Sequence, residues 1–138
     1  MTTRPEMLGD TSAWIALRRG RAEQVAAVRA VLRKGLMATC APVRLELLRG
    51  ARSRLELAAM RQRLSLLSSC AVQASTWARA EEVLALLAAR RGGRHRGMPP
   101  MDLLIAAIAE AHALPVLHDD EHFELIAQVT GQPMLRLA

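Results

Sequence analysis

The chain has 138 residues, the length of one domain, and its 51% hydrophobic composition supplies one buried core and excludes a disordered chain. Its formal net charge of +6 comes almost wholly from arginine, since Lys34 is the only lysine, and favours a polyanionic partner. Neither a signal peptide nor an uninterrupted apolar run of ~18–20 residues is present, so we expect a cytoplasmic protein without a membrane helix.

Apolar runs and helix-breaking residues predict alternating strands and helices in the first half of the chain. A short apolar run ends at Asp10, and the acid and hydroxyl residues that begin there suit a helix N-terminus. Gly35 ends a later helix, and Pro42 suits the first turn of the next. The predicted order is a strand at 7–9, a helix that pauses at 19–21 and resumes over 22–34, a strand at 36–40, and helical residues 42–67 with a break near 50.

The second half of the chain continues the same alternation. Its predicted elements are a weaker strand at 68–73, a helix at 75–90, a basic glycine-rich loop at 90–97, a helix at 101–112, a strand at 115–118, a helix at 121–129 and an edge strand at 134–137. This order indicates one α/β domain over residues 1–138, with a short, mainly parallel central sheet flanked by helices. Sites in such sheets form beyond the carboxyl ends of the strands.

Four acidic residues stand in apolar surroundings, whereas most others lie among polar neighbours. They are Asp10, Glu46, Asp102 and Asp120. A carboxylate in such surroundings is unfavourable without compensation. Helix capping compensates at the three aspartates but not at Glu46, which lies inside its predicted helix. Each acid alone fits a capping or ion-pair role, and the four together favour a shared cation.

Ligands that are all oxygen favour Mg²⁺ or Mn²⁺ over zinc. Such an ion polarises a phosphate oxygen and lowers the pKa of a bound water, which then attacks in line without a nucleophilic side chain. The sequence offers no convincing Ser–His or Cys–His pair. The acids therefore indicate phosphodiester hydrolysis, although spacing alone does not show that they meet.

The four acids also lie in recognisable motifs. In chain order these read DTSAW, LELLRGAR, DLLIAA and PVLHDDEHF. The ordered set resembles the PIN-domain ribonucleases, and most of all the VapC toxins of bacterial type II toxin–antitoxin systems. The resemblance runs from about Leu8 to the C-terminus. The resemblance is specific because all four motifs occur in this order and at this spacing, whereas a single short motif such as DTS is weak evidence for the family.

The resemblance implies a PIN-like domain whose catalytic acids are Asp10, Glu46, Asp102 and Asp120. Of these, the three aspartates would hold Mg²⁺ or Mn²⁺, and Ser12 would support the site. The substrate implied is RNA, either tRNA or rRNA. The family also implies a homodimer and a cognate antitoxin whose tail covers the active site.

The last motif departs from the family pattern, which usually reads acid–x–acid–aromatic. His122 takes the second acidic place, so a fifth carboxylate is missing. Asp119 stands where a tyrosine or arginine is common and offers a partial replacement for the lost charge. Asp120 is favoured as the metal ligand by its register with Phe123. His118 and His122 have the spacing of helical metal ligands, but we expect structural or supporting roles for both.

The loop at 90–97 holds the densest basic cluster of the chain. Its arginines are candidates for gripping RNA phosphates near Asp102: Arg90, Arg91, Arg94 and Arg96. A solvated, mobile loop explains the same residues, and a GC-rich genome that encodes its basic residues as arginine explains the charge. The chain has only three Phe and Trp side chains and no Tyr, which argues against an RNA-binding module built on base stacking.

Two other interpretations fit parts of the pattern. A receiver domain would need a phosphate-accepting Asp after its third strand and a lysine after its last, and neither is present, since residues 68–75 contain no acid. A degenerate PIN domain that only binds RNA or a partner protein is the stronger alternative, because of His122. Cys40 and Cys70 lie in apolar runs and are expected to be buried free thiols.

Overall fold

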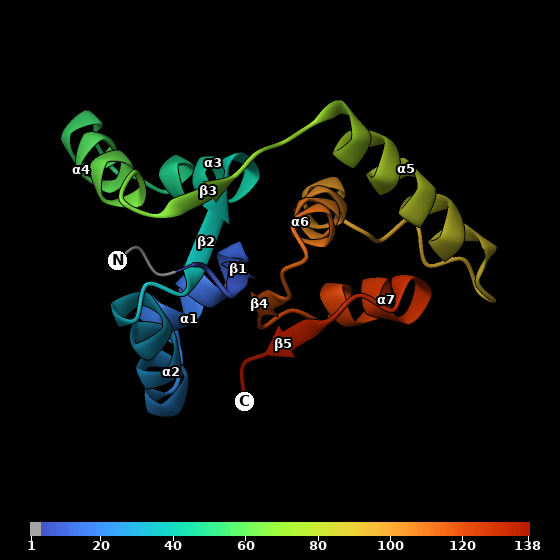
Figure 1. Ribbon diagram of the computed structural model, residues 1–138, viewed down its shortest axis with the longest axis horizontal. Coiled ribbons are helices and arrows are strands. Elements are labelled where there is room, and N and C mark those ends of the chain that lie inside the picture. The colour runs from blue at the N-terminus through green and yellow to red at the C-terminus, as the bar shows by residue number, and fades with distance from the viewer. Residues whose placement is uncertain (1–3) are drawn as a thin grey trace.

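A computed structural model describes residues 4–138, and within them five short strands form one sheet (Figure 1). The strands are β1 (Met7–Gly9), β2 (Met37–Cys40), β3 (Ser68–Cys70), β4 (Val116–His118) and β5 (Met134–Arg136). Their order in the sheet is β3-β2-β1-β4-β5, and every pair is parallel. The α/β fold with a parallel sheet is therefore confirmed.

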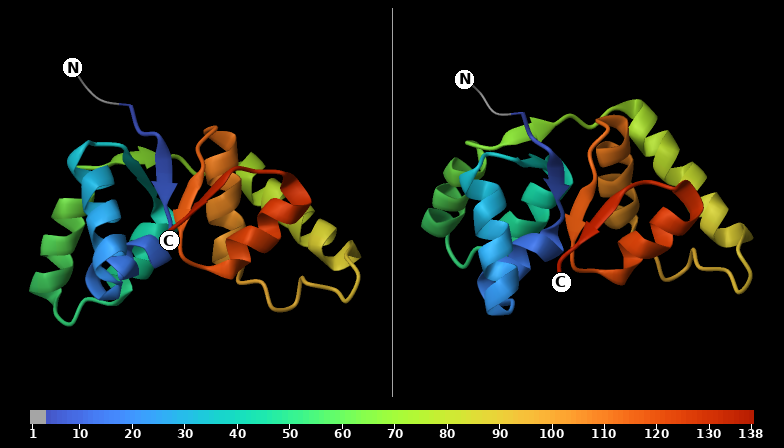
Figure 2. Two further views of the ribbon diagram at one scale, coloured as in Figure 1. Left: turned by 90° about the horizontal axis from the view of Figure 1, so that it is seen from below. Right: turned by 60° about the horizontal axis from the view of Figure 1, so that its bottom comes forward.

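Seven helices connect these strands in residues 4–138. They are α1 (Thr11–Arg19), α2 (Ala22–Arg33), α3 (Ala41–Arg49), α4 (Arg54–Leu64), α5 (Ala74–Ala89), α6 (Pro100–Ala111) and α7 (Glu121–Thr130). Figure 2 shows the helices gathered on both sides of the short central strands. In this part of the chain no helix has the length and apolar character that crossing a membrane requires.

Two apolar clusters lie on opposite faces of the sheet. Successive residues of a strand point to opposite faces, and the neighbours Met7 and Leu8 belong to different clusters. Leu117 and Val116 divide in the same way. The Met7 cluster includes side chains of α1 and α2, and the Leu8 cluster includes side chains of α3, α5, α6 and α7. Both faces are thus covered by helices, as a parallel sheet requires.

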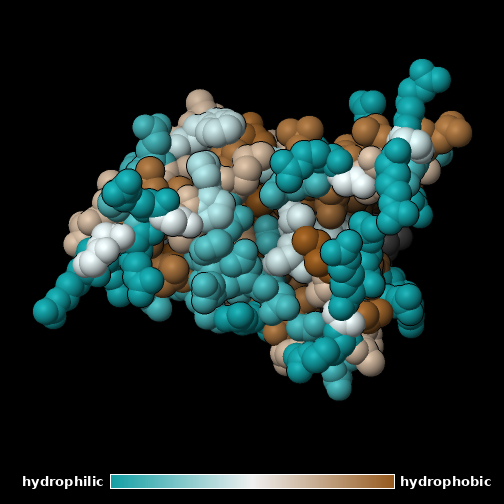
Figure 3. Space-filling model, turned by 180° about the vertical axis from the view of Figure 1, so that it is seen from behind, coloured by the Kyte–Doolittle hydropathy of each residue, from teal (hydrophilic) through white to brown (hydrophobic). Residues whose placement is uncertain are grey.

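Helix α6 is the most deeply buried element. Every residue from Asp102 to Ala109 is buried, and only the first of them carries a charge. At roughly 25 cal/mol per Å² of apolar surface removed from water, each large side chain here contributes about 1.5–3 kcal/mol. The helix is therefore a rigid support for the single carboxylate at its N-terminal turn. Outside the core, hydrophilic side chains predominate, with small apolar patches between them on the face seen in Figure 3.

The observed elements differ from the predicted ones mainly at β3. The prediction extended this strand to Gln73, but it ends at Cys70. Cys70 pairs with Cys40, the last residue of β2, and β3 has no second neighbour in the sheet. With no partner beyond Cys70 the backbone leaves the sheet, and Gln73 caps α5 instead. The two cysteines are free and buried, as expected, and burial raises the pKa of Cys40 to about 11.

Gly9 leaves room for the Met37 side chain next to the first acid of interest. A Cβ atom at this position would lie 2.6 Å from the sulfur of Met37 on β2, which is closer than such atoms approach. A larger residue would therefore force the Met37 side chain to move, directly beside Asp10, the next residue.

Candidate active site

The carboxyl ends of β1 and β4 bring two acidic segments together. The two strands are neighbours, and Gly9 pairs with Leu117. Asp10 follows β1 directly, and Asp119 and Asp120 follow β4. The site thus begins at the centre of the sheet, where helix N-termini also point.

Asp10 is held in place by the start of α1. It is the N-cap residue, and its Oδ2 accepts hydrogen bonds from the backbone amide and the hydroxyl of Ser12, at 2.9 and 2.7 Å. Only 3% of the residue is exposed, and its Oδ1 is buried without a partner in residues 4–138. Burial raises the pKa of Asp10, the bonds from Ser12 lower it, and the charge of Glu46 raises it further. One carboxylate oxygen is therefore left free for a ligand.

Ser12 also connects the two strand ends. The Asp119 backbone amide donates to the Ser12 hydroxyl oxygen at 2.9 Å, while the same hydroxyl donates to Asp10. The serine therefore fixes the distance between the segment after β1 and the segment after β4.

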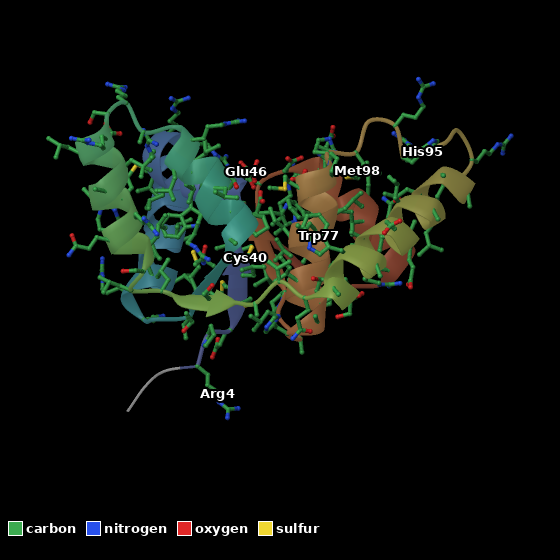
Figure 4. All side chains as sticks on the ribbon, turned by 90° about the horizontal axis from the view of Figure 1, so that it is seen from above. Arg4, Cys40, Glu46, Trp77, His95 and Met98 are labelled. Atoms are coloured by element: carbon green, nitrogen blue, oxygen red, sulfur yellow. The ribbon has the colours of Figure 1, made fainter. Side chains whose placement is uncertain are left out.

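Glu46 reaches the site from α3. The Thr11 hydroxyl donates to Glu46 Oε1 at 2.8 Å, which ties the middle of α3 to the first residue of α1. Figure 4 shows Glu46 on the same side of the molecule as Met98 and His95, with Arg4 on the opposite side. The role of Thr11 was missed from the sequence. The only signal for it was a hydroxyl residue directly after the first acid.

Asp102 lies in the first turn of α6, with its carboxylate facing two other acids. It is 8% exposed. Burial raises the pKa of Asp102 to about 7, and the charges of Asp10 and Asp120 contribute to the rise, while His122 lowers it. Carboxylates that raise one another's pKa in this way are close enough to repel when all are ionised.

Asp120 and His122 complete the cluster at the start of α7. Asp120 is the N-cap residue, and its Oδ1 accepts from the His122 backbone amide at 3.0 Å. The His122 Nδ1 atom lies 3.1 Å from Asp102 Oδ2 and 3.1 Å from Asp120 Oδ1. In residues 4–138, the group of ligand atoms that all lie within 4.8 Å of one another comes from Asp102, Asp120 and His122. His122 therefore stands inside the cluster, while Asp10 and Glu46 lie beside it.

Asp119 and His118 are turned away from this cluster. The Asp119 carboxylate accepts from Gln24 on α2 at 3.2 Å and lies 3.7 Å from Arg136 on β5. His118 is fully buried, and its Nδ1 accepts from the Asp120 backbone amide at 3.2 Å. Burial lowers the pKa of His118, and the charge of Arg136 adds to the effect. A neutral His118 thus shapes the turn that presents Asp120.

The basic loop at 90–97 approaches the site from one side. A hollow of about 520 Å³ is bordered by Arg91 and Arg94 on the loop and by Glu121 and His122 on α7. The views in Figure 2 place this loop on the side where the strands end. Arg90 donates to the carbonyl and side-chain oxygens of Gln128 on α7, at 3.3 and 3.4 Å, so it fastens the loop. Arg96 is exposed.

The donor set fits a hard divalent cation. Within residues 4–138, Asp10 has a buried carboxylate oxygen without a partner, and oxygens of Asp102 and Asp120 lie within 4.8 Å of each other. Oxygen ligands of this kind are those that Mg²⁺ and Mn²⁺ take in proteins. The protein is thus of the class of small α/β domains that gather carboxylates at the carboxyl ends of a parallel sheet.

Comparison with known proteins identifies the family. The PIN domain family matches residues 7–129. Ribonuclease VapC18 of Mycobacterium tuberculosis is 38% identical over 124 residues, which cover 90% of this chain and 89% of that protein. Ribonuclease VapC21 of the same species is 37% identical over 105 residues, or 75% of each chain. The chain belongs to the PIN-domain family, and within it to the VapC ribonucleases.

Solved structures show the same fold at lower identity. VapBC from Salmonella typhimurium, bound to DNA, superposes with a TM-score of 0.73 at 19% identity and covers 97% of this chain and 99% of that one. Mycobacterium tuberculosis VapC20, described as a sarcin–ricin loop cleaving toxin, gives a TM-score of 0.61 at 23% identity, with 86% and 92% covered.

Proposed function

We propose that this chain is a Mg²⁺- or Mn²⁺-dependent endoribonuclease, the toxin of a type II toxin–antitoxin pair, with Asp10, Glu46, Asp102 and Asp120 as its catalytic acids. The observation that carries the proposal is the buried Oδ1 of Asp10, which has no partner among residues 4–138. It lies beside Asp102, whose pKa is raised by burial and by its acidic neighbours. Such an arrangement is unfavourable without a cation and serves metal binding directly.

Each side chain has a distinct task in this proposal. Asp10, Asp102 and Asp120 hold the metal, and Ser12 keeps the first of them oriented by its hydrogen bond. Glu46, held by the hydrogen bond from Thr11, orients the attacking water. The bound cation supplies charge stabilisation of the phosphate and a water of lowered pKa.

The RNA is gripped by charge rather than by base stacking. Arg91 and Arg94 border the hollow that leads to His122, and Arg96 extends the basic surface. Phosphate contacts of this kind position the backbone next to the cation without reading sequence. The substrate is a structured loop of tRNA or ribosomal RNA in the cytoplasm, a class that includes the target named for VapC20.

The proposed partners are a cognate antitoxin and a second copy of the chain. VapBC complexes are among the similar solved structures. A mainly apolar groove of about 540 Å³ supports a partner whose apolar side chains cover this surface. Its lining includes Trp14, Leu17, Leu32, Leu47 and Leu64, with the charged Arg18, Glu56 and Arg63.

Cleavage of a structured RNA by purified protein tests the activity. Cleavage is expected with Mg²⁺ or Mn²⁺, none is expected with EDTA, and Asp10→Asn is expected to reduce the rate by about 100-fold or more. Glu81→Gln, an exposed acid on α5, is the matched control and should cut like the parent. An Asp10→Asn protein that cuts at the parent rate would falsify the proposed site.

Growth arrest on expression, relieved by a small protein encoded next to the toxin, tests the toxin role.

A further inference from the structure

His122 occupies the centre of the acidic cluster rather than its edge. Its Nδ1 lies 3.1 Å from an oxygen of Asp102 on α6 and 3.1 Å from an oxygen of Asp120 at the start of α7. Both carboxylates are at least partly buried, and the histidine side chain is 29% exposed. Three ligand atoms from two helices thus face one another over short distances.

The contact of His122 Nδ1 with Asp102 Oδ2 has the geometry of a hydrogen bond, whereas the equally short contact with Asp120 Oδ1 does not. An Nδ1 atom carries at most one hydrogen, which points well at only one acceptor. Ligands bound at roughly 2.1 Å around an octahedral cation lie about 3 Å from their neighbours. The separations of His122 from Asp102 and Asp120 match that spacing.

The cluster also has an open oxygen on a further side. Asp10 Oδ1 is buried without a partner in the described part of the chain, and the charge of Asp10 acts on Asp102. Asp10 is outside the group of side chains whose ligand atoms lie within 4.8 Å of one another, so its free oxygen borders this group beside Asp102. The unpartnered oxygen and the three converging ligand atoms are independent observations, and both favour a cation at this end of the sheet.

We propose that His122 coordinates the catalytic cation through Nδ1, together with Asp102 and Asp120, and that this nitrogen makes the site prefer Mn²⁺ to Mg²⁺. The inference rests on the proposed function, since it concerns the same metal. Imidazole suits transition metals, whereas a site made of carboxylates alone suits Mg²⁺ as well. The substitution of nitrogen for oxygen at this one position therefore changes which ion the protein selects.

Electron spin-echo spectroscopy of Mn²⁺ bound to the whole protein tests the coordination directly. Directly bound imidazole nitrogen gives a ¹⁴N coupling in this spectrum. We expect the coupling in the parent protein, its loss in His122→Asn and in His122→Asp, and its retention in His112→Asn. His112 is an exposed histidine at the end of α6 and serves as the matched control.

Competition between Mn²⁺ and Mg²⁺ tests the preference. The ratio of the two dissociation constants is expected to shift toward Mg²⁺ by on the order of tenfold in His122→Asp, which restores an oxygen ligand. Circular dichroism of each variant establishes that the fold is retained, and the parent spectrum alone already tests the nitrogen ligand.

The outcomes separate this inference from the proposed function. Mn²⁺ bound by the parent without ¹⁴N coupling means that His122 only hydrogen-bonds to the carboxylates. Coupling that persists in His122→Asn, or an unchanged ion ratio in His122→Asp, equally overturns the inference. In those cases the proposed metal site stands. A parent protein that binds no Mn²⁺ and no Mg²⁺ overturns both.

Discussion

A single hydroxyl joins the two halves of the site at the residue scale. Ser12 donates to Asp10 and accepts from the backbone amide of Asp119, so it positions one carboxylate and the turn that carries another. Neither contact adds charge to the site. The Ser12 hydroxyl therefore contributes by positioning other groups, and the loss of such positioning contacts lowers metal affinity measurably.

Removal of that hydroxyl is the first prediction. Ser12→Ala is expected to weaken metal binding and to lower kcat/KM by about 10-fold, because Asp10 loses one of its two hydrogen bonds and the Asp119 amide loses its acceptor. Isothermal titration with Mn²⁺ and RNA cleavage measure the two effects. Ser12→Thr keeps the hydroxyl and should lie near the parent. An alanine variant with parent metal affinity would contradict the positioning role.

The raised pKa of Asp102 makes the metal-free protein sensitive to pH. The group has a pKa of about 7 when folded against 3.8 as its ordinary value. Between those values the folded chain holds a proton that the unfolded chain has released. Rising pH therefore favours unfolding, and the stability that this group contributes is present below about pH 4 and lost as the pH passes through 7.

Comparison of Asp102→Asn with the parent isolates this effect. In EDTA, the free energy of unfolding of the variant relative to that of the parent is expected to rise by about 2 kcal/mol from pH 5 to pH 8. The reason is that the amide does not ionise, whereas the carboxyl group does. Chemical denaturation at the two pH values measures the difference. A difference that does not depend on pH would mean that Asp102 is already ionised at pH 5.

The basic loop at 90–97 is the proposed RNA-binding element. The double variant Arg91→Ala, Arg94→Ala is expected to bind RNA more weakly. The slope of the logarithm of the binding constant against the logarithm of salt concentration should also become shallower by roughly one unit for each arginine removed. Binding measured from low to physiological salt gives the slope. Arg4→Ala is the matched control, because Arg4 lies on the opposite side of the molecule (Figure 4). A parent-like slope in the loop variant would place the RNA elsewhere.

Much of the order of elements follows from local signals in the sequence. Asp10 after Gly9, Pro42, Gly50 and the prolines before Met101 mark where strands and helices begin or end, and the elements observed begin and end close to these residues. These signals act within a few residues of chain, so a sequence reveals them directly.

The pairing of strands and the direction of side chains depend on distant contacts. No signal within the neighbouring residues of the sequence predicts that β4 pairs with β1. Likewise, β3 is short because its partner strand β2 ends at Cys40, opposite Cys70. Asp119 and Asp120 are adjacent in the chain, yet Gln24 and Arg136 engage one while the other enters the cluster with His122. The sequence therefore indicated which segments would converge, and the structure was needed to orient each carboxylate.

For the whole molecule, removal of metal should lower stability. A cation that binds only the folded chain adds about 2.7 kcal/mol when the free ion is at roughly 100 times its Kd. We therefore expect Mn²⁺ to raise the Tm of the EDTA-treated protein by roughly 5–10 °C. Asp10→Asn should show a smaller rise, and Glu81→Gln the full one. Equal shifts in all three proteins would indicate binding outside the site.

The strand order has a further consequence for how the protein is made. β1 lies at the centre of the sheet between β2 and β4, and the carboxylates span positions 10 to 120. A nascent chain that has just passed Glu46 has two of the acids but no neighbour on the other side of β1. The proposed site is therefore complete only after the chain has been made past Asp120, and we expect a fragment that ends earlier to lack ribonuclease activity.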